Sequence, residues 1–360
     1  MKATGIHTYA GGFVVGARKA GIEILGSYET YKTPMRIASA IGVKNLTGTP
    51  IKSTDVVIAN PPCSRFSAMS VGTFTVEQRR LEAFCELNEV FQFALEADAS
   101  IVWWETGPLA ISIGKDTLVD CHKYWLEKWQ QDVTTVVVSL DLLYTGWPQR
   151  RPRTHVFHFR GDVPVVGMPT SRWTPDIRLK PWLKGTAAHG EPLIPYYENL
   201  GGQLKDPRSW TAYEHLRPGG FQSTLPILYT NESQSSMSMI GARYYGWYEE
   251  NQWWSMNDYM QVMGYPQDVD YGKLETCPTR QWYVHGISGK SVSPCASEYL
   301  ATNLLLPMFN REDTKGAVSA VPMETPGMFY YDLRVKRYKS VFWKPQPSDF
   351  VQYTRTKKVK

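Results

Sequence analysis

Short apolar runs alternate with helical periodicity over the first 160 residues of the chain, and this pattern constrains the fold more than any other feature. The clearest strand-like runs span residues 23–28, 55–59, 100–104, 134–140 and 154–159. Between them, residues 76–97 repeat apolar side chains at steps of three and four residues, as in an amphipathic helix. Alternating strands and helices predict a parallel, doubly wound α/β sheet, whose ligands bind at the carboxyl ends of the strands.

Composition and texture divide the 360 residues into four parts. With 42% hydrophobic and 13% aromatic residues, the chain can form a large core, and its length favours two domains over one. After residue 160 the helical pattern stops, and proline, glycine, tryptophan and tyrosine become frequent. Helical periodicity returns at residue 256. We therefore predict a first domain over residues 1–160, a separate module over 161–255, a further helical segment over 256–310 and a C-terminal extension over 311–360.

Cysteine usage and hydropathy exclude several classes of protein. The five cysteines are odd in number, widely spaced and free of CxxC pairs, so neither a disulfide framework nor a zinc site is indicated, and we expect no metal. No apolar run reaches the roughly 18 residues of a membrane span, and the N-terminus lacks the pattern of a secretory signal. We therefore expect no membrane partner and place the protein in the cytoplasm.

Positive charge is concentrated at the C-terminal end. Nine lysines and arginines stand against two aspartates between residues 332 and 360, a local charge of +7, so the remaining chain has a net charge of −2. Aromatic side chains are interleaved with these cations, as in segments that contact phosphates and stack on bases. Two interpretations remain open from the sequence, a nucleic-acid contact and a solvated tail.

A glycine-rich turn lies near the start of the chain. Ala10-Gly11-Gly12-Phe13 places glycines where a strand would pass into a helix, and backbone amides at such a turn can approach a ligand closely. Glu29 follows the next strand-like run, where a carboxylate can accept hydrogen bonds from ribose hydroxyls. A turn without a ligand is the alternative.

The second motif is Asn60-Pro61-Pro62-Cys63, which directly follows a strand-like run. This position puts Cys63 at the carboxyl end of a strand, beside any ligand bound at the glycine turn. Residues 67–75 are small and polar enough to form a mobile loop over that ligand. Cys63 is then either a nucleophile, which needs nearby positive charge to ionise, or a buried structural cysteine.

Two further motifs bring a carboxylate and arginines towards the same edge. Glu105 closes an apolar run, and a carboxylate there is costly to bury unless it is partnered or protonated. A Gln-Arg-Arg-Pro-Arg segment begins at Gln149 and leads into a strand. Alternation sends Arg151 and Arg153 to one face of that strand and Arg150 to the other. Near a cysteine and a glutamate, the arginine pair favours an anionic or carbonyl-bearing substrate over a solvated basic edge.

The four motifs, in this order, resemble the DNA (cytosine-5)-methyltransferase family, with its glycine-rich donor turn, Pro-Cys nucleophile, Glu-Asn-Val acid and Gln-Arg-Arg-x-Arg strand. Residues 256–266 are similar to the family's segment ending in Gly-Phe/Tyr-Pro, and residues 289–294 to its late Gly-Asn-Ala/Ser-Val-x-Pro turn. The resemblance covers about residues 5–160 and 220–305. It implies a Rossmann-like class I methyltransferase fold, in which residues 1–160 form the catalytic and donor-binding domain. A small target-recognition domain is inserted after it, and residues 256–310 form a return segment that completes the catalytic domain and its donor site.

The resemblance also implies a mechanism on double-stranded DNA. Cys63 would attack ring carbon 6 of a flipped-out cytosine. Glu105 would hydrogen-bond the ring nitrogen and amino group, and Arg153, supported by Arg151, would hold the carbonyl oxygen. Thiolate addition makes carbon 5 nucleophilic, so that it accepts an alkyl group from S-adenosylmethionine. The implied donor-binding residues are His7, Tyr9, Ala10, Gly11, Gly12, Phe13, Glu29, Asn60, Pro62, Lys290 and Ser291.

The sequence departs from the family pattern around the donor. Tyr9 replaces the first glycine of the donor turn, His7 replaces an aromatic residue, and Lys290 stands where the late turn normally carries asparagine. Close to a sulfonium a lysine is unfavourable, because like charges ~4 Å apart repel by about 4 kcal/mol at an effective dielectric of about 20. Lys290 could point to solvent or to the donor's own carboxylate. Alternatively, the donor is carboxy-S-adenosylmethionine, whose extra carboxylate would pair with Lys290, and a carboxymethyl group is transferred.

Two other functions remain open from the sequence. A catalytically inactive relative could still bind DNA, although the nucleophile, the acid and both arginines are retained. An enzyme acting on free cytosine nucleotides would have little use for a recognition module or a basic end. Because the module is short, we expect few base contacts and a short or relaxed target. A DNA-modifying enzyme with such a target would suit wholesale modification of a viral or mobile genome in a bacterial or bacteriophage-infected cell.

Overall fold

The computed structural model describes residues 1–61, 66, 75–174, 177, 179, 227–229, 236–237, 245–247, 252–274, 290–312 and 316–335. At its centre lies a mixed sheet. The strands are β1 (Lys2–Ile6), β2 (Glu23–Tyr28), β3 (Val56–Ala59), β4 (Ile101–Thr106), β5 (Val133–Asp141), β7 (Pro152–Arg160), β12 (Val321–Pro322) and β13 (Met328–Leu333). They are arranged in the order β12-β13-β5-β7-β4-β3-β1-β2.

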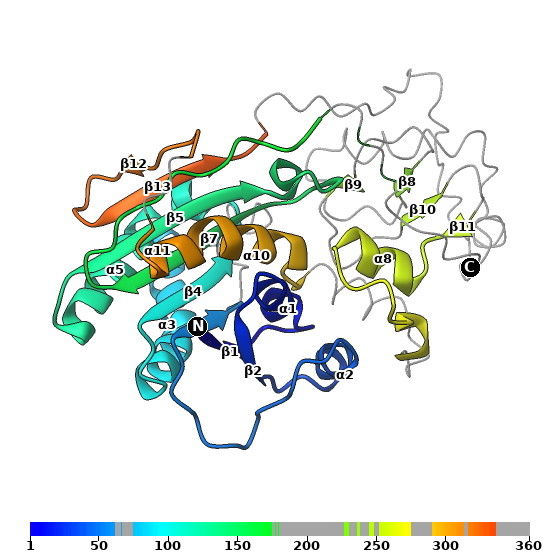
Figure 1. The fold of residues 1–360 in the computed structure, drawn as a ribbon, viewed down its shortest axis with the longest axis horizontal. Helices are drawn as coiled ribbons and strands as arrows, with labels where there is room; N and C mark the ends of the chain where they lie inside the picture. The colour runs from blue at the N-terminus through cyan, green and yellow to red at the C-terminus, as the bar shows by residue number, and fades with distance from the viewer. Residues whose placement is uncertain are drawn as a thin grey trace, which may run out of the picture.

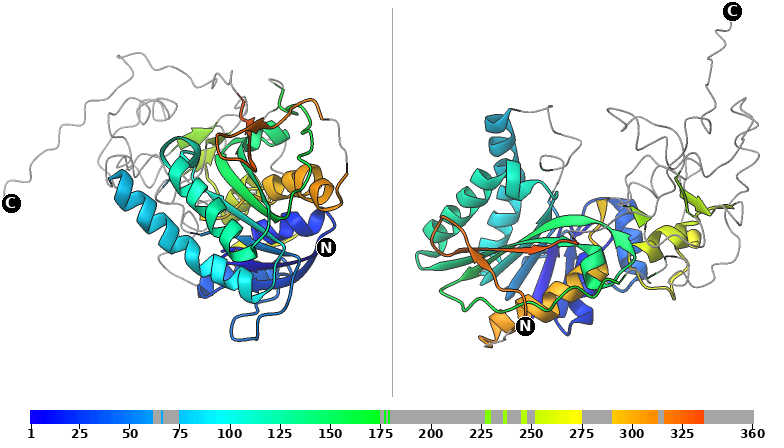
Figure 2. Two further views of the ribbon diagram at one scale, coloured as in Figure 1. Left: turned by 90° about the vertical axis from the view of Figure 1, so that its left-hand side faces the viewer. Right: turned by 90° about the horizontal axis from the view of Figure 1, so that it is seen from above.

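Helices cover both faces of this sheet (Figures 1 and 2). One face carries α1 (Gly12–Lys19), α2 (Lys32–Ala40), α10 (Pro294–Leu300), the π-helical turn η7 (Ala301–Leu305) and α11 (Leu306–Phe309). The other face carries α3 (Val76–Glu96) and α5 (Lys115–Trp129). The shorter helical elements are α4 (Ala110–Ile113), η3 (Leu142–Thr145), α8 (Met256–Val262) and η6 (Tyr271–Leu274).

Four short strands are described between residues 161 and 255, the segment predicted to be an inserted domain. They are β8 (Ile227–Tyr229), β10 (Tyr245–Trp247) and β11 (Gln252–Trp253), which form one small sheet, and β9 (Ser236–Met237), which pairs with β6 (Gln149–Arg150). Most of the predicted insert lies outside the described residues. The pairing of β6 with β9 places part of the insert beside the arginine motif.

The predicted strands and the long helix are confirmed to within about two residues, because periodicity reports burial directly. Thr75 caps α3, since its side chain accepts a hydrogen bond from the backbone N–H of Gln78. The sheet departs from the parallel arrangement predicted from the alternating pattern at β7, which runs antiparallel to β4 and β5. Only residues 142–151 connect β5 to β7, which is too short for the crossover that a parallel pair requires.

Strand β4 is buried on both faces, which explains its uninterrupted apolar run. Trp103 stacks on Phe157, with ring centroids 4.8 Å apart, and meets Phe13 of α1 edge-on at 4.6 Å. Trp104 points to the opposite face, where its Nε1 donates to Nε2 of His158 at 3.1 Å. Successive tryptophans thus anchor the two helical layers to one central strand.

Strands β12 and β13 extend the sheet beyond β5, in a region where no strand was predicted. β13 runs parallel to β5, from the pair Met328–Thr135 to the pair Leu333–Leu140. Tyr331 is fully buried, and its hydroxyl donates to the carbonyl of Val166. The predicted C-terminal extension therefore begins with a structural part of the sheet.

The return segment packs directly on the first helix. Gly16 of α1 faces Ser297 of α10, and a Cβ at Gly16 would lie only 1.9 Å from the Ser297 Oγ. The same hydroxyl donates to the carbonyl of Phe13 at 2.8 Å. Glycine is required at this position because any side chain would separate the two helices.

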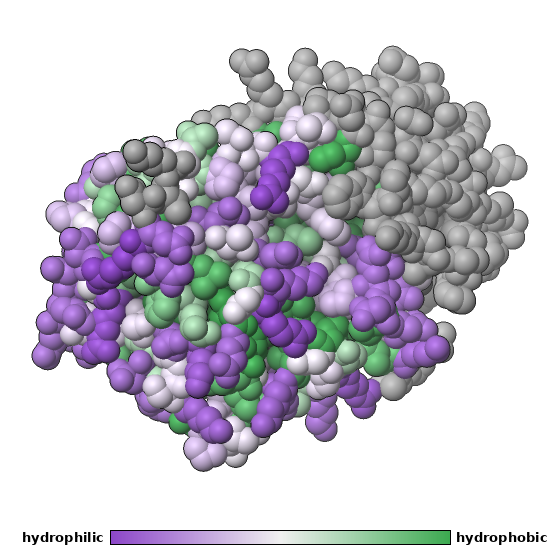
Figure 3. Space-filling model, viewed as in Figure 1, coloured by the Kyte–Doolittle hydropathy of each residue, from purple (hydrophilic) through white to green (hydrophobic). Residues whose placement is uncertain are grey.

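The surface of the molecule is mixed in polarity. Figure 3 shows a largely hydrophilic face with hydrophobic side chains gathered near its middle, in the region of α1 and α10. In the part of the chain that the structure describes, no helix has both the length and the apolar character that crossing a bilayer requires.

Candidate active site

The carboxyl ends of β2, β3 and β4 gather three of the predicted site residues. β1 pairs in parallel with both β2 and β3, and β3 pairs in parallel with β4. Glu29 after β2, Asn60 after β3 and Glu105 near the end of β4 therefore lie at one edge of the sheet. The proposed nucleophile Cys63 and its neighbour Pro62 lie outside the described residues, as does most of the predicted mobile loop. β3 ends at this edge of the sheet, so the segment that contains Cys63 begins there.

Glu105 is buried beside an arginine. Only 2% of its surface is exposed, and its Oε1 lies 3.0 Å from Nε of Arg153. Burial raises the pKa of Glu105 to about 7, while Arg153 and then Arg151 oppose the shift. Protonated and ionised forms of this carboxyl are therefore both populated near neutral pH. Such a group can donate or accept a proton according to what is bound beside it.

Arg151 connects the arginine motif to the return segment. Its buried side chain donates through Nη2 to the carbonyl of Ser291 at 2.8 Å. Its backbone N–H donates to Oδ1 of Asp141 at 2.9 Å. Arg150 is exposed, whereas Arg151 and Arg153 line one cavity, as strand alternation predicted. The arginine motif is therefore held both by the return segment, through Ser291, and by the end of β5, through Asp141.

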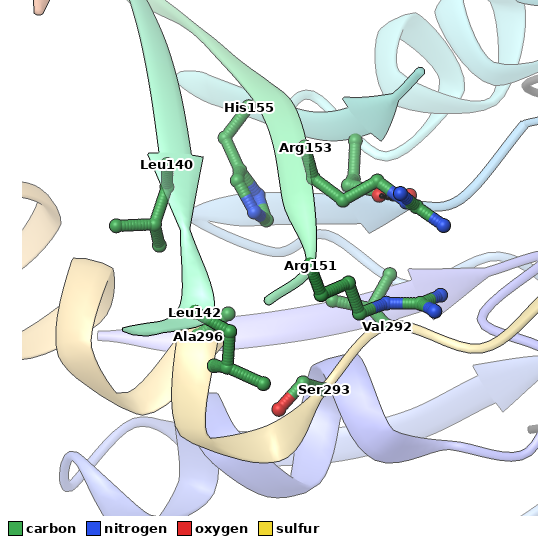
Figure 4. Close-up of a pocket in the computed structure, with 9 residues that line it drawn as sticks. Leu140, Leu142, Arg151, Arg153, His155, Val292, Ser293 and Ala296 are labelled. Atoms are coloured by element: carbon green, nitrogen blue, oxygen red, sulfur yellow. Dashed lines mark ion pairs between the residues drawn. The ribbon is translucent and has the colours of Figure 1, made fainter. Parts of the chain in front are cut away.

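A small cavity lies beside the Glu105–Arg153 pair (Figure 4). Its lining combines polar and apolar side chains, namely Glu105, Arg151, Arg153, His155, Ser293, Leu140, Leu142, Val292 and Ala296. His155 stands opposite Glu105 in the pairing of β7 with β4. Burial lowers the pKa of His155 to about 3, so its ring is neutral, and its Nδ1 has no hydrogen-bond partner among the described residues.

His155 and Ser293 were not among the predicted site residues. The available signal for His155 was its position two residues after Arg153, on the same face of the strand. Ser293 belongs to the late turn recognised by its motif, but the sequence did not show that this turn meets the arginine strand.

The glycine-rich turn is completed by the return segment. Gly11 adopts φ 79°, which favours glycine, and the N–H of Gly12 donates to the hydroxyl of Tyr265 at 3.1 Å. A Cβ at Gly12 would lie 2.3 Å from the carbonyl oxygen of Val292. Burial raises the pKa of Tyr265 to about 12, so the hydroxyl stays protonated. Tyr265 was part of a recognised motif, but its contact with the turn was not predicted.

Glu29 organises the backbone around the same turn. It is buried, and its Oε2 accepts a hydrogen bond from the N–H of Tyr9 at 2.9 Å. Its Oε1 accepts from the N–H groups of Thr30 and Tyr31 at 2.9 and 3.1 Å. A carboxylate has about four acceptor positions, so these bonds leave capacity for a ligand hydroxyl.

Three further predicted donor residues, far apart in the sequence, lie together. The Nζ of Lys290 is 5.8 Å from the ring centroid of Tyr9. The side-chain amide of Asn60 donates to the carbonyl of Lys290 at 2.9 Å. The donor turn, the end of β3 and the late turn thus meet at one place, as a shared ligand site requires.

The remaining predicted donor residues have other surroundings. Ala10 and Phe13 are fully buried in the core, so they support the turn from below. His7 is partly exposed, and its Nε2 lies 3.1 Å from a carboxylate oxygen of Glu89 on α3. Within the described residues, no cluster of three or more His, Cys, Asp or Glu side chains could hold a metal ion.

Several solved methyltransferase structures are similar to this chain in fold. The Entamoeba histolytica methyltransferase EhMeth matches with a TM-score of 0.54 and 10% identity, over 83% of this chain and 96% of its own. A protein described as a DNA modification methyltransferase encoded within a prophage (E. coli) matches with a TM-score of 0.52 and 13% identity, over 86% and 99%. A Spodoptera frugiperda DNMT2 mutant matches with a TM-score of 0.53 and 12% identity, over 86% and 99%.

These matches establish the fold of the chain. The strand order β2-β1-β3-β4-β7-β5, with β7 antiparallel, is typical of class I methyltransferases. The predicted Rossmann-like class I fold is therefore confirmed. No protein-family model matches the sequence, and a sequence search of curated proteins finds no match.

Proposed function

We propose that this protein is a DNA cytosine-5 alkyltransferase. The observation that carries the proposal is the buried Glu105–Arg153 pair, which lies at the carboxyl edge of a class I methyltransferase sheet. A carboxyl group with a pKa near 7 beside a fixed guanidinium suits a base that presents a ring nitrogen, an amino group and a carbonyl oxygen. Cytosine presents these three groups along one edge.

The catalytic roles follow from that pairing. Glu105 hydrogen-bonds the ring nitrogen and amino group of the flipped-out cytosine, while Arg153 holds its carbonyl oxygen. Arg151 supports Arg153 through the anchored arginine motif. The thiolate of Cys63 bonds to carbon 6, and the electron pair released to carbon 5 forms the new bond to the transferred carbon as the bond from that carbon to the donor sulfur breaks, which leaves S-adenosylhomocysteine. Loss of the carbon-5 proton to water and expulsion of the thiolate restore the ring.

The residues around the glycine turn fit an S-adenosylmethionine-type donor. A Cβ on Gly12 would lie 2.3 Å from the Val292 carbonyl oxygen and 2.5 Å from the Tyr265 hydroxyl, so glycine lets the return segment pack closely against the turn. Glu29 offers acceptor capacity for ribose hydroxyls. When bound, the donor supplies an electrophilic carbon on a sulfonium. The chain's own residues orient that carbon towards carbon 5 of cytosine.

Lys290 favours a second form of the donor. Its ammonium group lies beside Tyr9 of the donor turn and makes no ion pair with a described residue. An unpaired cation repels a sulfonium but attracts a carboxylate. We therefore propose carboxy-S-adenosylmethionine as a donor beside S-adenosylmethionine, with 5-carboxymethylcytosine as its product. Mass spectrometry of DNA incubated with each donor distinguishes methyl from carboxymethyl transfer.

A covalent trap tests the cytosine reaction. Duplex DNA containing 5-fluorocytosine should form a stable adduct with the enzyme and donor, because fluorine at carbon 5 blocks the final elimination. Cys63→Ser should form no adduct and retain duplex binding, since phosphate contacts do not need the thiolate. Matched reactions with single-stranded RNA and with a free cytidine nucleotide test the other substrates. If no oligonucleotide gives an adduct that depends on Cys63, the proposed reaction is wrong.

A further inference from the structure

Tyr9 adopts a backbone conformation that favours glycine. Its φ is 58°, and His7, two residues earlier, has φ 52°. Few non-glycine residues adopt the left-handed region, and those that do gather at functional sites. Tyr9 occupies the place of the first glycine in the donor motif, so the turn keeps the glycine conformation but adds a phenol ring. Because a tyrosine with positive φ is less favourable than a glycine, we expect a contact of the Tyr9 side chain to offset this cost.

The Tyr9 side chain is held in place from two sides. Glu29 accepts the hydrogen bond of the Tyr9 backbone N–H at 2.9 Å, which fixes the start of the side chain. The ring lies tilted against Tyr31, with centroids 6.0 Å apart. Burial, together with Glu29 and Tyr31, raises the pKa of Tyr9 to about 12, so the ring carries a neutral hydroxyl. Tyr9 therefore presents a fixed, electron-rich surface beside the donor turn.

Lys290 approaches that surface from the return segment. Its Nζ is 5.8 Å from the Tyr9 ring centroid, within the range of a cation–π interaction. Its carbonyl accepts the hydrogen bond from Asn60, which fixes the Lys290 backbone at the end of β3. A lysine side chain otherwise samples many rotamers. The aromatic ring restricts this freedom and keeps the ammonium group at the donor turn.

We propose that Tyr9 is a specificity-determining residue for the donor, acting through Lys290. The ring holds the ammonium group where the donor's reacting end binds, and the pair favours a sulfonium with a carboxylate on the transferred carbon over a sulfonium with a methyl group. The first donor is neutral at its reacting end and offers Lys290 an anion, whereas the second brings an unbalanced positive charge. This inference rests on the proposed function, because it assumes a sulfonium donor at the glycine turn.

Donor binding without DNA tests the proposal. Calorimetry would measure the dissociation constants of carboxy-S-adenosylmethionine, S-adenosylmethionine and their common product, S-adenosylhomocysteine. We expect Tyr9→Gly to lower the preference for the carboxylated donor about two- to fivefold, the size of an exposed cation–π interaction. Tyr9→Phe should keep the preference, because it keeps the ring. Unchanged binding of S-adenosylhomocysteine, whose sulfur carries no charge, shows that the turn is still folded.

A double-mutant cycle that combines Tyr9→Gly with Lys290→Gln tests whether Tyr9 acts on donor preference through Lys290. Once Lys290 is replaced, Tyr9→Gly should change the donor preference no further. An equal effect of Tyr9→Gly in both backgrounds, or a preference unchanged by Tyr9→Gly, overturns the proposal. The binding assay involves no cytosine, so its outcome is independent of the 5-fluorocytosine trap. A donor preference without trapping refutes the proposed reaction, whereas trapping without a donor preference refutes the role of Tyr9.

Discussion

At the scale of single residues, the protonation of Glu105 controls the proposed chemistry. Its pKa is raised to about 7 by burial, so the folded protein binds a proton there that the unfolded chain loses near pH 4.5. The free energy of unfolding therefore falls, through this group, as the pH rises from about 4.5 to 7. In the proposed reaction, the same titration would remove the hydrogen that Glu105 donates to the cytosine ring nitrogen.

The transfer rate should follow this titration. We expect the single-turnover rate to fall as the pH rises through about 7, because the protonated acid is lost. Glu105→Gln should lower the rate by at least ~100-fold and abolish this limb of the pH profile. The measurement is rapid-quench transfer to labelled duplex DNA between pH 6 and 9. A variant with unchanged rate and pH profile would remove Glu105 from the proton path.

Prediction from sequence succeeded for residues whose position in a strand determines their environment. Glu105 and the two inward arginines follow from strand ends and alternation, which act over a few residues. The contact of Tyr9 with Lys290 joins residues on separate elements, and no local pattern reports such a contact. His155 was missed because a single histidine in an apolar strand is usually a core residue.

At the scale of elements, β13 is a strand that hydrophobic periodicity did not predict. Its six residues are rich in aromatic side chains, but they precede a basic segment that hid the strand signal. The antiparallel direction of β7 was likewise missed, because apolar runs indicate burial and carry no information on direction. The short connection between β5 and β7 could have predicted the antiparallel pairing, since a parallel pair requires a longer crossover.

The burial of Tyr331 predicts that β13 is structural. We expect Tyr331→Ala to lower the free energy of unfolding by about 3–5 kcal/mol, since a fully buried aromatic ring is removed. Tyr330→Ala, at a partly exposed neighbour on the same strand, should cost less than half as much. Urea denaturation monitored by fluorescence would measure both. Equal, small losses would mean that β13 contributes little to the sheet.

At the scale of the whole molecule, the direction of β13 determines where the basic end of the chain begins. β13 is parallel to β5, so residue 334 follows at the carboxyl edge of the sheet, where Glu105 and Asn60 also lie. Figure 1 shows β13 and β5 pointing the same way. Most of the basic segment lies outside the described residues, but its starting point is on the proposed DNA side.

Removal of the segment should weaken DNA binding without regard to sequence. A chain that stops after Leu333 should bind all duplexes more weakly by the same factor, and the salt slope should fall by about 0.9 for each phosphate that the segment neutralises in the full-length protein. Lys19→Gln with Lys128→Gln, at the opposite edge of the sheet, is the control and should leave the slope unchanged. Binding isotherms at several salt concentrations measure this. A slope unaffected by truncation would favour a solvated tail.

The hydrogen bond between Gly12 and Tyr265 spans 253 residues, and this separation affects how the protein is made. The glycine turn leaves the ribosome early, whereas the tyrosine that completes it is added roughly 10 to 50 s later at ordinary rates of synthesis of about 5–20 residues per second. Until these later residues are synthesised, the contacts of Gly12 with Tyr265 and of Asn60 with Lys290 cannot form. We therefore expect the proposed donor to bind only after Tyr265 and Lys290 have been synthesised, and shorter ribosome-bound fragments should not bind it.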